Sequence, residues 1–274
     1  MSVENPAPGH EIVRTRGGAL AMRSVAAGEV MHPGVGPVVE AEELYVRQSR
    51  LAERLGAAAA PLVVYDVGLG AGSNAFAAWA TAAHAPAGAA RLTLLSFERD
   101  LGALALALDH AADFAIAPAA VEAGRALLAT GAHESARTSW RLVRGDLLEA
   151  LQRPHPAADI IFWDPFSPRA NPELWTVAAF RAARHLASDR CTLFTYSAST
   201  ATRVALLLGG WAVGAGASIG DKAATTAAAV AAGDLAAPLA RRWLRRLTLP
   251  DVPLPPDAPA TFATTIAALA QFSS

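Results

Sequence analysis

The residues best suited to chemistry begin with a glycine-rich segment that follows an apolar run. The segment extends from Asp66 to Asn74, reads DVGLGAGSN, and opens a helix at Ser73. Glycine lets the backbone turn tightly and approach a ligand closely, and a helix N-terminus offers free N–H groups. A dinucleotide site needs a further glycine three residues after Gly70, where this chain has Ser73. The pattern favours S-adenosylmethionine over NAD, with a plain strand-to-helix turn as the alternative.

Two further acids end the next predicted strands. Glu98 is placed where a carboxylate can accept hydrogen bonds from both ribose hydroxyls, although it can also be a surface acid beside Arg99. Asp146 can face the adenine amino group, and it serves equally well as the N-cap of the following helix. The predicted cofactor-binding residues are Asp66, Gly68, Gly70, Gly72, Asn74, Glu98 and Asp146.

A fourth apolar strand delivers Asp164 to the edge of the sheet where open α/β folds bind ligands. The strand continues into DPFSP and then NPELW, so Phe166 can pack on a substrate or cofactor face. A helix-capping turn is the alternative. If the substrate is an amine, it must be neutral when it attacks, so Asp164 can orient its N–H or take its proton while Phe166 and Tyr196 wall the pocket. These three residues are the predicted catalytic residues.

Other chemistries lack their motifs. The chain has neither a GxxxxGK[ST] phosphate loop nor a GxSxG nucleophile elbow, which disfavours NTPases and serine hydrolases of the usual kinds. The histidines show no metal-ligand spacing and the single cysteine, Cys191, lies in an apolar run, so no metal site is predicted. His32 is a candidate for binding substrate or for a structural hydrogen bond.

The elements that must position these residues alternate between apolar runs and helical segments, which predicts a doubly wound, mostly parallel α/β sheet. Together with the glycine-rich turn that favours S-adenosylmethionine, this sheet is expected to be of the Rossmann-like class I methyltransferase type. The predicted strands are 62–67, 91–97, 140–143, 159–163 and 191–196. The predicted helices start near residues 73, 101, 146, 172 and 200, with an extra helix over 121–129. A closing pair of strands, one of them antiparallel, should follow Trp211 with its turn near Gly220 and Asp221.

The two ends of the chain are predicted to extend this domain. Residues 10–35, with the pair Gly17 and Gly18, predict a small β-hairpin, and residues 39–55 predict one amphipathic surface helix. Residues 249–259 are rich in proline and should lead to a short C-terminal helix. The predicted divisions are 1–38 for the hairpin extension, 39–232 for the methyltransferase domain and 233–274 for an Arg/Pro-rich tail.

Composition limits the class of protein. Of 274 residues, 53% are hydrophobic and 17% charged, which predicts a folded chain. A net charge of −1 gives no chain-wide positive field for nucleic acid, leaving one local basic group, Arg241, Arg242, Arg245 and Arg246, which also fits a solvated helix face. A single cysteine and the absence of a signal-peptide pattern favour the cytoplasm. The uncharged stretch from Val204 to Gly220 contains five glycines, so we expect a helix end and a strand there instead of a membrane span.

The sequence resembles the MnmC-like methyltransferases, and the resemblance spans most of the chain. It is carried by MHP at 31–33, GP at 36–37, EAE at 40–42 with Tyr45, the Asp66–Asn74 loop, DPFSP at 164–168 with NPELW at 171–175, and TYS at 195–197. The best-known member is the methyltransferase half of a bacterial enzyme that completes 5-methylaminomethyl-2-thiouridine in tRNA. We expect this half alone, without the FAD-dependent oxidase half.

The resemblance implies cofactor contacts at Gly68, Gly70, Gly72, Glu98 and Asp146, with Asp164 near the methyl-accepting nitrogen. It also implies substrate binding by Lys222, which is what this chain keeps of a basic segment after the sixth strand. The acceptor, a tRNA 5-aminomethyl group or a small amine, and the oligomeric state stay open. An aminopropyltransferase and a catalytically inactive binding module of the same fold are the alternative functions.

Overall fold

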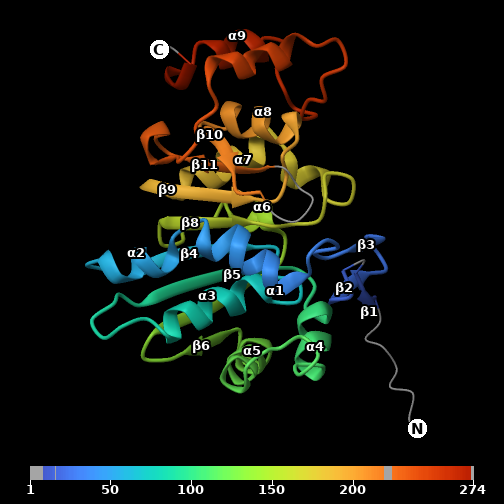
Figure 1. The fold of residues 1–274 in the computed structure, drawn as a ribbon, viewed down its shortest axis with the longest axis vertical. Coiled ribbons are helices and arrows are strands. Elements are labelled where there is room, and N and C mark those ends of the chain that lie inside the picture. Colours follow the sequence, from blue (N-terminus) through green and yellow to red (C-terminus); the bar gives the residue numbers. More distant parts are fainter. Residues whose placement is uncertain (1–8, 16, 219–223, 273–274) are drawn as a thin grey trace.

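The structure is a computed structural model that describes residues 9–15, 17–218 and 224–272 (Figure 1). Its centre is a sheet with the strand order β10-β11-β9-β8-β4-β5-β7-β6. β4, β5, β7, β8 and β9 are mutually parallel, whereas β11 runs antiparallel to β9. This arrangement confirms the predicted doubly wound sheet with an antiparallel closing strand. The strands are β4 (Leu62–Val67), β5 (Leu92–Glu98), β6 (Ala132–Glu134), β7 (Thr138–Arg144), β8 (Ala158–Trp163), β9 (Ala187–Thr195), β10 (Ala212–Gly216) and β11 (Thr225–Ala229).

The five predicted parallel strands are present, and the structure adds a short edge strand, β6, which pairs antiparallel with β7. The predicted closing pair is also present as β10 and β11, but the expected turn at Gly220 and Asp221 lies outside the described residues. The uncharged stretch after Val204 contains the end of α8 (Thr200–Leu208) followed by β10, as predicted. Among the described residues, no helix is long and apolar enough to cross a membrane.

Both faces of the sheet are buried because alternate strand residues point to opposite sides. Tyr65 and Trp163 belong to one apolar cluster, which α7 (Val177–His185) and α8 cover. Val64 and Phe162 belong to the other, which α3 (Ser73–Ala83) and α5 (Pro118–Thr130) cover. The predicted extra helix over 121–129 is therefore α5. The other helices in the connections between the parallel strands are α4 (Gly102–Asp109), the single turn α6 (Leu147–Ala150) and the 3₁₀ helix η2 (Pro172–Trp175).

The N-terminal extension is a small antiparallel sheet rather than a two-stranded hairpin. β1 (His10–Arg14) and β2 (Leu20–Ser24) pair across the turn that contains Gly18, as predicted, and β3 (Glu29–Val30) adds a short third strand. β1 and β2 contact α4, so this sheet sits beside the carboxyl ends of the parallel strands (Figure 1).

The single helix predicted over 39–55 is wrong, because the segment forms three pieces. They are α1 (Pro37–Glu40), the π-helix η1 (Ala41–Arg47) and α2 (Leu51–Ala57). Within the π-helix, Leu44, Tyr45 and Val46 are all buried, so this segment is packed on more than one side and is not the surface helix that was predicted. Arg50 then interrupts the helix with a left-handed backbone, φ 55°.

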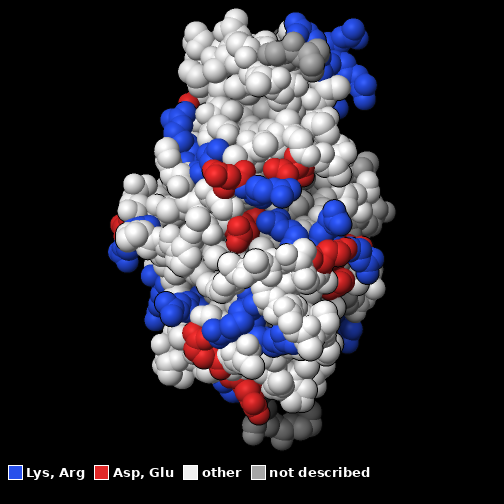
Figure 2. Space-filling model, turned by 90° about the vertical axis from the view of Figure 1, so that its left-hand side faces the viewer, with Lys and Arg blue, Asp and Glu red and all other residues white. Residues whose placement is uncertain are grey.

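The C-terminal segment packs against α8 and beside the edge strand β10, where its apolar residues join the cluster that α7 and α8 share (Figure 1). It contains the 3₁₀ helix η4 (Arg241–Thr248), α9 (Phe262–Ala267) and η5 (Ala270–Phe272). Trp243 and Leu247 are buried while Arg241, Arg242, Arg245 and Arg246 are exposed, as expected of a solvated helix face. Figure 2 shows basic side chains at this end of the molecule and interspersed charges of both signs elsewhere on the same face.

Candidate active site

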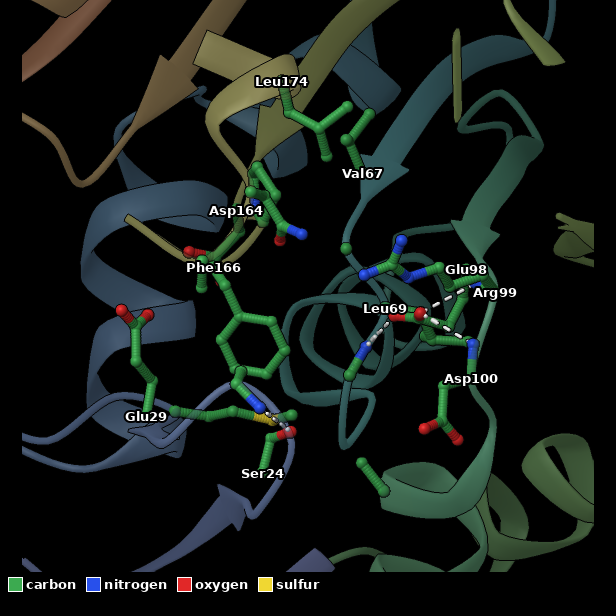
Figure 3. Close-up of a pocket in the computed structure, with 18 of the residues that line it drawn as sticks. Ser24, Glu29, Val67, Leu69, Glu98, Arg99, Asp100, Asp164, Phe166 and Leu174 are labelled. Atoms are coloured by element: carbon green, nitrogen blue, oxygen red, sulfur yellow. Dashed lines mark hydrogen bonds between the residues drawn. The ribbon is translucent and has the colours of Figure 1, made fainter. Parts of the chain in front are cut away.

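A cavity of about 630 Å³ lies where the parallel strands end. Its floor consists of residues that follow β4, β5, β7 and β8, and residues of the N-terminal sheet and of the loop after β3 line the opposite side. The volume falls in the range of small-molecule sites, roughly 300–1,000 Å³, and the carboxyl edge of an open α/β sheet is where such sites form. The cavity is therefore the candidate active site (Figure 3).

The glycine loop after β4 forms one part of this floor, and each of its three glycines is required for a different steric reason. All three have positive φ: 84° at Gly68, 51° at Gly70 and 87° at Gly72. A β-carbon on Gly68 would lie 2.7 Å from the backbone oxygen of Asp164. One on Gly72 would lie 2.6 Å from the ring of Phe76, inside the core. Only at Gly70 would it meet a flexible side chain, that of Met31, within the cavity wall.

Glu98 ends β5 and anchors this loop through its carboxylate. One oxygen accepts a hydrogen bond from the N–H of Gly70 at 3.0 Å, and the other accepts from the N–H groups of Arg99 and Asp100 at 2.8 and 3.0 Å (Figure 3). The side chain lines the cavity. Since a carboxylate has about four lone-pair sites, it retains capacity for hydroxyl donors from a ligand.

Asp146 also lines the cavity and caps α6, accepting a hydrogen bond from the N–H of Glu149 at 3.1 Å. Both interpretations of its position in the sequence, helix cap and cavity residue, therefore agree with the geometry.

Asp66 lies beneath the glycine loop and does not line the cavity. Its side chain is fully buried and accepts a hydrogen bond from the hydroxyl of Ser96 at 2.8 Å, which itself accepts from the indole N–H of Trp140 at 2.9 Å. Burial raises the pKa of Asp66 to about 7, against the opposing hydrogen bond from Ser96. Its other oxygen has no hydrogen-bond partner among the described residues. The Asp66 side chain is thus bound to β5 and lies behind the cavity.

Asp164, directly after β8, has a buried carboxylate that lines the cavity. Its Oδ2 accepts a hydrogen bond from the side-chain amide of Asn74 at 2.7 Å, so Asn74 contacts Asp164 and does not itself line the cavity. Burial raises the pKa of Asp164 above its ordinary value, while the charge of His32 and the hydrogen bond from Asn74 act to lower it. A carboxylate held in this way can accept a proton or a cationic donor.

His32 lies beside Asp164, in the loop between β3 and α1. Its Nε2 is 3.7 Å from Oδ2 of Asp164 and its Nδ1 is 3.6 Å from Oε2 of Glu40. The His32 side chain is 11% exposed and lines the cavity, as does Glu40.

Phe166 and Tyr196 form walls of the same cavity. The ring of Phe166 projects into it (Figure 3), and the indole N–H of Trp175 donates to the backbone oxygen of Phe166 at 2.8 Å. The hydroxyl of Tyr196 donates to the backbone oxygen of Pro165 at 3.1 Å. Tyr196 also packs edge-on against Trp175, with ring centroids 5.6 Å apart. Together these contacts fix the turn that follows Asp164.

A residue that the sequence did not indicate, Glu29 in β3, ties the N-terminal sheet to this turn. Its carboxylate accepts hydrogen bonds from the N–H and the hydroxyl of Ser167 and from the guanidinium of Arg169. These hydrogen bonds lower the pKa of Glu29 against the opposing effect of burial. No local sequence pattern marks Glu29, because its partners lie about 140 residues away.

Most of the predicted site residues therefore line the cavity. Those that line it are His32, Gly68, Gly70, Glu98, Asp146, Asp164, Phe166 and Tyr196. Asp66, Gly72 and Asn74 lie behind that lining, and Lys222 is outside the described residues. Within the described part of the chain, no group of three or more His, Cys, Asp or Glu side chains is arranged to hold a metal ion.

Comparisons with known proteins agree with this geometry. Residues 124–231 match a family model described as S-adenosyl-L-methionine-dependent methyltransferase. The tRNA 5-methylaminomethyl-2-thiouridine biosynthesis bifunctional proteins MnmC of Burkholderia mallei (strain SAVP1) and Burkholderia pseudomallei (strain 668) are each 31% identical over 198 residues. That match spans 68% of this chain but only 30% of either relative. The crystal structure of MNMC2 from Aquifex aeolicus superposes with a TM-score of 0.74 at 25% identity, covering 97% of this chain and 85% of that one.

Proposed function

Since this chain belongs to the S-adenosyl-L-methionine-dependent methyltransferases, in the MnmC-like family, we propose that it methylates the nitrogen of a primary amine, the 5-aminomethyl group of a tRNA wobble uridine. The observation that carries the proposal is one cavity whose floor brings the glycine loop after β4 next to the buried carboxylate of Asp164 after β8. The tRNA acceptor is proposed from the Burkholderia relatives, which are tRNA 5-methylaminomethyl-2-thiouridine biosynthesis proteins, and it implies a cytoplasmic location.

The residues at the loop fit the cofactor of this family, S-adenosylmethionine. The backbone of Gly68 and Gly70 lines the cavity without side chains, and Glu98 presents a carboxylate at the end of β5. We assign Glu98 to the ribose hydroxyls and Asp146 to the adenine amino group, with Asp66 and Gly72 supporting the loop from behind. When bound, the cofactor supplies an electrophilic methyl group, so the protein has only to align the acceptor and remove a proton.

The residues around Asp164 suit an amine acceptor. A protonated amine cannot attack, and Asp164 can take its proton at Oδ1 or Oδ2, leaving the nitrogen lone pair free. Phe166 and Tyr196 wall this part of the cavity and exclude water from it. Asn74 keeps the Asp164 side chain in place through its 2.7 Å hydrogen bond. Lys222 stays proposed as a substrate-binding residue on the resemblance alone.

The proposal is tested by transfer of labelled methyl groups from S-adenosylmethionine into tRNA that carries 5-aminomethyl-2-thiouridine. We expect label in the 5-methylaminomethyl nucleoside after digestion and none in the same tRNA transcribed without modification. Asp164→Asn should lower turnover by about 10²-fold or more, the usual contribution of general base catalysis, while calorimetry shows adenosylhomocysteine binding within about threefold of wild type. Asp113→Asn, an exposed aspartate outside the cavity, is the control.

Parallel reactions separate the alternatives. Methylation of small primary amines without any transfer into modified tRNA would refute the tRNA acceptor. Transfer of an aminopropyl group from decarboxylated S-adenosylmethionine would indicate an aminopropyltransferase instead. Binding of adenosylhomocysteine with no transfer to any acceptor would leave the binding module as the correct description.

A further inference from the structure

His32 occupies an unusual position between two buried carboxylates that arrive from distant parts of the chain. Glu40 comes from α1 and Asp164 from the end of β8, and their side chains are 4% and 8% exposed. The two ring nitrogens of His32 face them at 3.6 and 3.7 Å, one nitrogen toward each. These separations are longer than a good hydrogen bond, and contacts of this kind commonly tighten only when substrate is bound.

The backbone of His32 is held in place at a conformational cost. Its φ is 53°, in the left-handed region that non-glycine residues rarely adopt. Such strain persists where surrounding contacts fix the residue, and it often accompanies functional sites. The strain aims the imidazole into the space between the two carboxylates instead of toward solvent.

A positive charge at this point has a clear electrostatic consequence. Two carboxylates close together in a buried site disfavour each other's ionisation, whereas a cation between them favours it. The Glu40 charge raises the pKa of Asp164 and the His32 charge lowers it. The other titratable groups that face this cluster are Tyr45 from η1, Tyr196 from the end of β9 and Asp66 from β4.

We propose that His32 is a positioning residue that holds Asp164 as a carboxylate ready to take the acceptor's proton, with Glu40 fixing the imidazole through its other nitrogen. The inference rests on the proposed function, in which Asp164 accepts a proton from an ammonium group. In this arrangement Glu40 orients the imidazole of His32, as the buried carboxylate of a hydrolase triad orients its histidine. The difference is that His32 then acts on a second carboxylate, that of Asp164.

The first test is the substitution His32→Asn, because asparagine tolerates a left-handed backbone better than most residues but carries no charge. We expect kcat for methyl transfer to modified tRNA to fall about tenfold near neutral pH, with both KM values within about threefold of wild type. The loss should shrink as the pH is raised, because Asp164 then ionises without help. A uniform loss at every pH, or a loss confined to KM, would overturn the proposal.

Two further variants separate the effect of the His32 charge from the effect of its strained backbone. Arg50→Asn changes another residue that has a left-handed backbone, φ 55°, but lies outside the cavity, and it should leave kcat unchanged. His32→Gly relieves the strain and leaves space for a free imidazole, so added imidazole should restore part of its kcat. Absence of rescue, together with a normal melting temperature, would argue against a chemical role for the ring.

A direct measurement keeps this inference separate from the choice of acceptor. The side-chain carboxyl ¹³C signal of Asp164, assigned by its disappearance in Asp164→Asn, can be titrated in the full chain without any substrate. We expect its midpoint to move to higher pH in His32→Asn. An unchanged midpoint refutes the role of His32 even if modified tRNA is methylated, and a shifted midpoint supports it even if tRNA proves to be the wrong acceptor.

Discussion

The close approach of two loops at Gly68 makes a quantitative prediction for the substitution Gly68→Ala. A β-carbon there would lie 2.7 Å from the backbone oxygen of Asp164 and 3.0 Å from Cα of Pro165, so no side-chain rotation can relieve the contact. The left-handed backbone alone costs an alanine about 1–2 kcal/mol, and overpacking against fixed atoms typically adds about 1–3 kcal/mol. We therefore expect the free energy of unfolding to fall by about 2–5 kcal/mol.

A matched control is available at Gly88. Its φ is 88°, close to the 84° of Gly68, but a β-carbon there would have no atom within 4 Å. Gly88→Ala should therefore lose only the backbone cost of about 1–2 kcal/mol. Urea unfolding of both variants gives the difference directly. Equal losses in the two variants would refute the argument that Gly68 is required by the approach of Asp164.

Gly68→Ala should also lower methyl-transfer turnover, because relief of the contact must displace either the loop or the turn that holds Asp164. Gly70→Ala should behave differently, since its β-carbon would meet only the flexible Met31 side chain. We expect a smaller loss of stability there, and weaker adenosylhomocysteine binding in calorimetry because Gly70 lines the cavity. If Gly70→Ala binds adenosylhomocysteine as tightly as wild type, the cofactor does not bind at this loop.

Three further predictions concern the acids and their partners. Glu98→Gln removes a charged acceptor from the proposed ribose contact, worth about 1.5–3 kcal/mol, so calorimetry should show adenosylhomocysteine affinity falling at least tenfold. Ser96→Ala deprives Asp66 and the indole of Trp140 of their partner and should cost about 1–3 kcal/mol per unpaired group in urea unfolding. The pKa of Asp66 is raised from 3.8 to about 7, so its contribution to stability is greatest below pH 4 and is lost as the pH rises through 7. Asp66→Asn should therefore flatten the decline in unfolding free energy between these limits, and an equally steep decline in that variant would contradict the assignment.

The strand pattern could be predicted because it is local. β4 has the predicted bounds, and the other four parallel strands differ from their predictions by a few residues at the ends. The residues that end these strands, Glu98, Asp146 and Asp164, could be located for the same reason, since their place follows from the strands themselves. The resemblance to MnmC-like methyltransferases was confirmed by the comparisons.

What could not be predicted depends on long-range packing. The amphipathic pattern over 39–55 indicated one helix, but burial of Tyr45 against Phe162 in β8 favours the π-helical turns. Glu40 became a site residue only because α1 lies over the cavity, which charge patterning does not reveal. β6 was missed because a three-residue edge strand carries almost no periodic signal.

The aromatic and amide contacts of the C-terminal segment determine where the chain can be shortened. The rings of Trp243 and Phe272 stack at 6.5 Å with an angle of 9°, and the side-chain amide of Gln271 bonds to both backbone groups of Val213 in β10. Deleting everything after Ala232 would expose apolar residues of α8 and free the backbone hydrogen-bonding groups of the edge strand β10. Such a truncated protein should aggregate, because residues 233–272 cover apolar surface and an edge strand that would otherwise pair with another copy of the chain.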